Sequence, residues 1–84
     1  MDGIIAGAYV CKARGVSYNY EVVWERNDAL LRWSGDVSHR SRRAFARGEL
    51  PLPGGIDSGD AVRLGVAIWI EDYSRGLADR EPHP

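Results

Sequence analysis

The densest group of chemically capable side chains lies in residues 38–48, SHRSRRAFARG, which contain four arginines and a histidine. Guanidinium groups bind phosphate oxygens in a two-point geometry, so this segment is a candidate contact for an anion or a nucleic acid. The chain as a whole has 11 basic and 12 acidic residues and a net charge of −1, which is unusual for a protein that depends on counterion release. We therefore interpret the cluster as a solvated surface neutralised by nearby acids, or less favourably as a contact for a protein partner, with an anion or nucleic-acid contact as the alternative. The residues of that alternative are Arg40, Arg42, Arg43 and Arg47.

Residues 53–60, PGGIDSGD, form a glycine-rich loop of the kind that can hold phosphate at the start of a helix. Asp57 and Asp60 would repel that anion, so we predict that they cap the helix instead. A nucleophilic Ser58 would need a base within hydrogen-bond reach, and nothing in the sequence brings His39 near it. Metal-ligand spacing is also missing, so we expect neither a cofactor nor a metal, and no enzymatic activity. The scattered residues that could ligate a metal are Cys11, His39 and His83.

The single cysteine, Cys11, lies in an apolar run and cannot form a disulfide within the chain. We expect a buried, reduced thiol in a cytoplasmic protein. The first residues have an acid at position 2 and too short an apolar run for a signal peptide. No segment approaches the roughly 20 apolar residues that span a bilayer. The expected location is therefore the cytoplasm, without membrane contact.

Residues 16–25, VSYNYEVVWE, show the period-2 alternation of a half-buried strand. A β-rich run precedes it across a turn at Gly15, and a third alternating run follows at residues 29–37. Short connections between three such runs predict an antiparallel meander, in which Trp24 and Trp33 pair across strands. Residues 38–50 fit a fourth strand, a helix or an irregular segment about equally well.

The last element is a predicted helix over residues 58–74, with Asp57 as N-cap and Gly76 as stop. The sequence thus predicts an α+β fold, an antiparallel three- to four-stranded meander with one C-terminal helix packed across one face. Residues 1–76 would form one domain, and residues 77–84 a flexible polar tail. One helix stripe should lie on the sheet, namely Val62, Val66, Trp69, Ile70 and Tyr73, while Arg63, Glu71 and Ser74 should face solvent.

A second row of small and apolar residues flanks that stripe, more than a single sheet contact needs. We expect a homodimer, joined through this row or through an exposed sheet edge. The alternative is that residues 38–56 fold back and cover the row. The predicted function is accordingly a small non-enzymatic interaction or regulatory protein that acts as a homodimer, with a nucleic-acid-binding module as the alternative. The residues of the row are Ala61, Leu64, Gly65 and Ile68.

Overall fold

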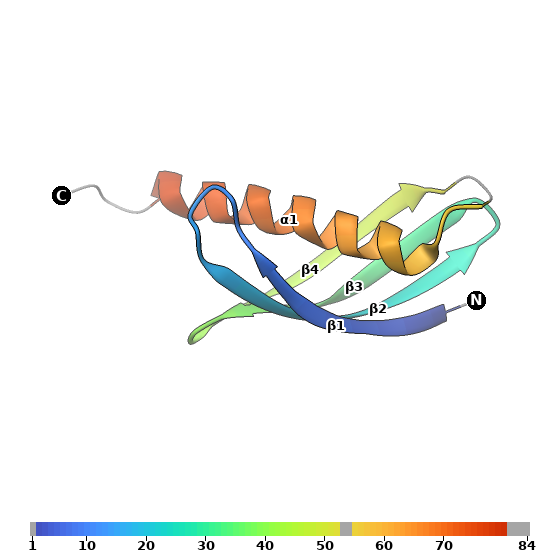
Figure 1. Cartoon of the computed structure of the whole chain (residues 1–84), viewed down its shortest axis with the longest axis horizontal. Helices are drawn as coiled ribbons and strands as arrows, with labels where there is room; N and C mark the ends of the chain where they lie inside the picture. Colours follow the sequence, from blue (N-terminus) through green and yellow to red (C-terminus); the bar gives the residue numbers. More distant parts are fainter. Residues whose placement is uncertain (1, 53–54, 81–84) are drawn as a thin grey trace.

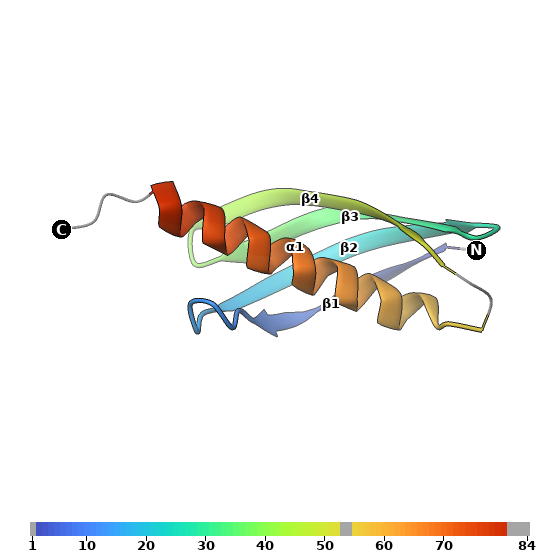
Figure 2. The same cartoon turned by 90° about the horizontal axis from the view of Figure 1, so that it is seen from above.

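Four strands and one helix make up the chain in a computed structural model, which describes residues 2–52 and 55–80. The strands follow one another in a single antiparallel sheet of order β1-β2-β3-β4, and the helix lies across one face of it (Figures 1 and 2). The predicted α+β fold is confirmed, and the open choice at residues 38–50 is resolved as a turn and a fourth strand. The elements are β1 (Asp2–Val10), β2 (Ser17–Asn27), β3 (Leu30–His39), β4 (Arg42–Pro51) and α1 (Ser58–Arg80).

The alternation in the sequence decides which face of the sheet is buried. Successive side chains on a strand point to opposite faces, so every second residue of β2 and β3 faces α1. The predicted pairing of Trp24 with Trp33 is confirmed by the register between these strands. The buried residues of β2 and β3 are Tyr18, Tyr20, Val22, Leu31, Trp33 and Val37.

Glycines make room for the large aromatic rings of this face. A Cβ at Gly48 of β4 would lie 2.7 Å from the Trp33 Nε1, and one at Gly65 of α1 would lie 2.8 Å from the same atom. Trp24 occupies the space above Gly3 of β1 in the same way. Because these neighbours have no side chain, the rings pack directly against backbone, and α1 comes close to the sheet.

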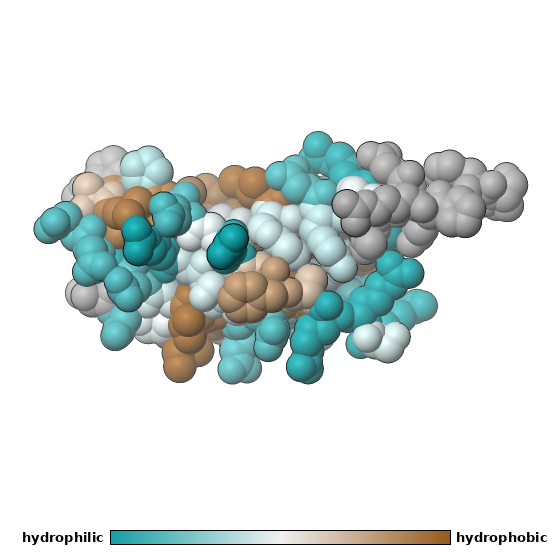
Figure 3. All heavy atoms as spheres, turned by 180° about the vertical axis from the view of Figure 1, so that it is seen from behind, coloured by the Kyte–Doolittle hydropathy of each residue, from teal (hydrophilic) through white to brown (hydrophobic). Residues whose placement is uncertain are grey.

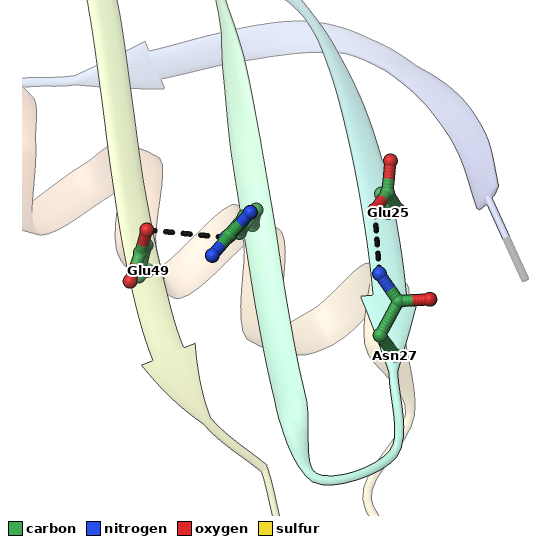
Figure 4. A network of polar contacts seen from close by, with 4 residues as sticks. Glu25, Asn27 and Glu49 are labelled. Atoms are coloured by element: carbon green, nitrogen blue, oxygen red, sulfur yellow. Dashed lines mark hydrogen bonds and ion pairs between the residues drawn. The ribbon is translucent and has the colours of Figure 1, made fainter.

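The opposite face of the sheet is solvent-exposed and carries both polar and apolar side chains. Arg32 of β3 forms an ion pair with Glu49 of β4 at 3.2 Å, and Asn27 donates a hydrogen bond to Glu25 (Figure 4). Apolar side chains reach the surface between such groups, as the lower side of the molecule in Figure 3 shows. Since both members of the ion pair are exposed, it contributes little to stability.

Asp57 caps α1 as predicted. Its Oδ2 accepts a hydrogen bond from the Asp60 amide at 2.9 Å, and its carbonyl accepts one from the Ala61 amide at 3.1 Å. The connection before the helix is fastened by Arg26 of β2, which donates to the Leu52 carbonyl and to the Ser58 hydroxyl. Ser58 therefore has a structural contact at the helix start.

The end of α1 and the position of Ser74 differ from the prediction. The helix does not stop before Gly76 but continues to Arg80, because a glycine ends a helix only where the backbone turns left-handed. Residues 77–80 of the predicted tail are thus helical, and residues 81–84 lie outside the described residues. Ser74 is fully buried rather than solvent-facing, because it follows Val66 and Ile70 on the same stripe at four-residue steps.

We predict that Gly65→Ala lowers the free energy of unfolding. The new methyl would overlap the Trp33 indole, and overpacking of this kind costs about 1–3 kcal/mol, more than the roughly 1 kcal/mol that alanine gains over glycine in a helix. Gly76→Ala is the matched control, since nothing lies within 4 Å of its Cβ position, and it should stabilise the protein. Urea unfolding measures both. Equal stabilisation by the two changes would contradict the packing of Trp33 against α1.

Candidate anion-binding site

A pocket of about 320 Å³ is lined by residues of the β1–β2 loop, the β3–β4 hairpin and α1. The β1–β2 loop and the β3–β4 turn lie at the same end of the sheet, on the left of Figure 1. Its wall combines basic and aromatic side chains from four separate parts of the chain. Its principal lining residues are Arg14, Tyr18, His39, Arg40, Arg42 and Tyr73.

Three arginines give this pocket its charge. Arg14 comes from the β1–β2 loop, and Arg40 and Arg42 come from the β3–β4 turn and the start of β4. No acidic residue of the described chain lines the pocket, although the protein as a whole has a net charge of −1. Arg14 and Arg42 also interact with other groups of the chain. The pocket therefore gathers three basic side chains on a nearly neutral molecule.

Arg40 occupies an uncommon backbone conformation. Its φ is 55°, in the two-residue turn between β3 and β4. Glycine or asparagine adopts this left-handed conformation at lower cost than an arginine does. The turn thus carries a long cationic side chain at a position where backbone geometry favours a small one.

His39 is oriented by a hydrogen bond across the sheet. Its Nδ1 lies 2.8 Å from the carbonyl oxygen of Ser17, and its ring lies 5.2 Å from that of Tyr18. A carbonyl oxygen only accepts, so Nδ1 must be the protonated nitrogen. The Nε2 atom then accepts a hydrogen bond in the neutral ring and donates one in the charged ring.

Tyr73 supplies the wall on the α1 side. Its ring stacks on that of Trp69, with centroids 4.9 Å apart and an angle of 15° between the planes. The stacked partner restrains the tyrosine, so this wall is an ordered aromatic surface.

The four arginines predicted as one cluster are divided between the two faces of the sheet. Arg42 lies opposite His39 in the register of β3 and β4, and it lines the pocket together with Arg40. Arg43 and Arg47 alternate along β4 with the buried Ala46, so they project from the opposite face. Period-2 alternation separates neighbours that the sequence places side by side. Sequence analysis missed Arg14, whose only signal was its place beside Gly15 in a predicted turn.

Glu71 of α1 holds the β1–β2 loop against the helix. Its carboxylate accepts hydrogen bonds from the Tyr9 hydroxyl at 2.6 Å, the Lys12 amide at 2.8 Å, the Cys11 thiol at 3.1 Å and the Ala13 amide at 3.2 Å. The expectation that Glu71 faces solvent was therefore wrong, because its partners are loop groups that helical periodicity does not register. The next residue of the loop after these contacts is Arg14.

These hydrogen bonds change the titration of the groups involved. The Tyr9 hydroxyl first, then the Lys12 amide and the Cys11 thiol, lower the pKa of Glu71 to about 2. The same contact with Glu71 raises the pKa of Tyr9 above its usual value. Cys11 is fully buried, as predicted, and its thiol donates to the carboxylate. The loop is thus fixed by an ionised acid at neutral pH.

The small and apolar row predicted on α1 is divided in a similar way. Ala61 is buried, and Gly65 lies against Trp33 of the same chain, so this part of the row is covered by the sheet. Leu64 and Ile68 remain 63% and 54% exposed.

Within residues 2–52 and 55–80 there is no group of three or more His, Cys, Asp or Glu side chains placed to hold a metal ion. The described part of the chain likewise contains no helix that is long and apolar enough to cross a membrane. Comparisons with protein-family models, curated proteins and solved structures give no match for this chain.

We predict that Glu71→Gln destabilises the protein in a pH-dependent manner. The pKa of Glu71 is about 2 in the folded chain and about 4.3 in an unfolded one, so ionisation stabilises the fold above about pH 5 and loses this effect as the pH falls toward 2. The difference in melting temperature between wild type and variant should be largest near neutral pH and shrink on acidification.

Thermal unfolding at a series of pH values measures this difference. Asp72→Asn is the matched control, since Asp72 is exposed on the same helix and should give a small offset at every pH. An offset for Glu71→Gln that is the same at acidic and neutral pH would show that the carboxylate does not hold the loop.

Proposed function

We propose that this chain is a small, non-enzymatic binding protein whose pocket takes a small phosphate-bearing ligand. The observation that carries the proposal is the convergence of Arg14, Arg40 and Arg42 on one pocket, from the β1–β2 loop and the β3–β4 hairpin. A phosphate group offers several acceptor oxygens, which planar guanidinium groups from different directions can share.

The size of the pocket favours a small ligand. A volume of about 320 Å³ lies at the lower end of the range for small-molecule sites, roughly 300–1,000 Å³. The aromatic rings of Tyr18 and Tyr73 in the wall can contact an apolar or planar part of the ligand while the arginines bind its phosphate.

The division of the arginines disfavours the alternative of a nucleic-acid-binding module. A polymer backbone is followed by a track of cationic groups on one continuous surface. Arg43 and Arg47 lie on the sheet face opposite to Arg40 and Arg42, so the cluster does not make one such track.

We predict that Arg40→Ala and Arg42→Ala each weaken the binding of pyrophosphate by about tenfold or more. Loss of one charge-assisted hydrogen bond costs about 1.5–3 kcal/mol, and 1.4 kcal/mol is a factor of ten in affinity. Isothermal titration calorimetry in a phosphate-free buffer of low ionic strength measures the effect. The matched controls are Arg43→Ala and Arg47→Ala, which remove the same charge from the opposite face and should change the affinity little.

A single-stranded oligonucleotide provides the second arm of this experiment. If all four arginine variants weaken its binding to a similar degree and pyrophosphate does not bind, the nucleic-acid alternative replaces the pocket. If the wild-type protein binds neither probe at low salt, the proposed function is wrong.

A further inference from the structure

The outer edge of β1 lacks the features that normally protect an edge strand. Residues 3–10 of this strand, GIIAGAYV, make up all of β1 except Asp2, and they include no charged residue and no proline. The other edge strand, β4, has several charged side chains and Pro51. Since an edge presents unpaired backbone donors and acceptors, natural sheets protect it with charges, prolines or bulges. The protection is present on β4 and missing on β1.

Apolar side chains flank this edge on the open face of the sheet. Ile4 is 72% exposed and Val10 is 60% exposed, and Ala6 and Ala8 between them are also exposed. The register places Val23 of β2, which is also exposed, beside Ile4. The open face is therefore most apolar along β1, whereas Arg43, Arg47 and Glu49 occupy it along β4.

The helix side of the same edge is apolar as well. A groove of about 250 Å³ lies between β1 and the outer surface of α1, lined by Tyr9, Leu64, Ala67 and Ile68 with polar residues at its end. In Figure 2, α1 crosses the sheet diagonally and leaves part of β1 uncovered at one margin. Leu64 and Ile68 thus lie beside the β1 edge, on the opposite side from Ile4 and Val10.

We propose that a second copy of this chain pairs with β1 in antiparallel fashion, which forms one continuous sheet across a symmetric dimer. A two-fold axis near the middle of β1 makes the strand its own partner. The residues there, Ala6, Gly7 and Ala8, are neutral, so no like charges face each other across the seam.

The choice of a second copy over a foreign strand follows from what has to be covered. An added strand alone would pair the backbone edge, whereas a second copy also brings its own Leu64 and Ile68 to the seam. The same operation therefore pairs the backbone edge, sets the β1 side chains of the two copies side by side on the open face, and brings the two grooves to the seam. An 84-residue domain buries a smaller fraction of its surface than a larger domain does, so a dimer contact adds to its stability.

Sedimentation equilibrium over a range of concentrations in the tens of micromolar tests this proposal. The wild type should sediment as a dimer, and Ala6→Lys should weaken the dimer at least tenfold, because it places two lysines at the seam. Ala6 is exposed, so circular dichroism should show an unchanged fold. Phe45→Lys is the matched control, since Phe45 is 65% exposed on the same sheet face but belongs to β4. It should leave the dimer intact.

Two outcomes overturn the proposal. One is a wild-type protein that remains monomeric at these concentrations, which would leave β1 to another partner or to none. The other is a dimer that Phe45→Lys disrupts and Ala6→Lys does not. The experiment uses no ligand, so its result is independent of pyrophosphate binding, and each proposal can fail without the other.

Discussion

The Trp33 indole lies between Gly48 of β4 and Gly65 of α1, and the arrangement of the other elements depends on this contact. Neither glycine has a side chain to displace the ring, so the helix rests directly on the sheet. The path of the 23-residue helix is set by this approach and by the fully buried Val62, Val66 and Ile70. Residues two turns further along α1 are thereby brought to the end of the sheet. The packing of one ring thus determines where the helix can supply functional groups.

Glu71 and Tyr73 are the groups that α1 supplies there. The Glu71 carboxylate accepts hydrogen bonds from two backbone amides of the β1–β2 loop, those of Lys12 and Ala13. These contacts fix the position of the next residue, Arg14. Tyr73 forms one wall of the pocket, and the β3–β4 turn supplies the remaining arginines from the other side. The candidate site is therefore built from one restrained loop, one tight turn and one rigid helix. This division explains why the site is formed without any metal-type cluster among the described residues.

The sequence allowed prediction of the parts of the fold that show a strong periodic pattern. The alternation in β2 and β3, the cap at Asp57 and the buried stripe of α1 could all be predicted from local residues. The strand β4 could not, because its inward positions are small: Ala46 and Gly48 fill the space that neighbouring large rings leave. Glu71 escaped prediction for a different reason, since its partners are backbone amides and a hydroxyl that are remote in the chain. Patterns within one element do not contain information about contacts of that kind.

Amide chemical shifts during a titration with pyrophosphate would show whether the proposed anion binds among Arg14, Arg40 and Arg42. We expect saturable shifts in the backbone signals of Arg14, of residues 39–42 and of Tyr73, which together surround the pocket. The signals of Arg47 and Glu49, on the opposite face, should stay unchanged. Shifts confined to that opposite face, or no saturable shift at all, would contradict the account.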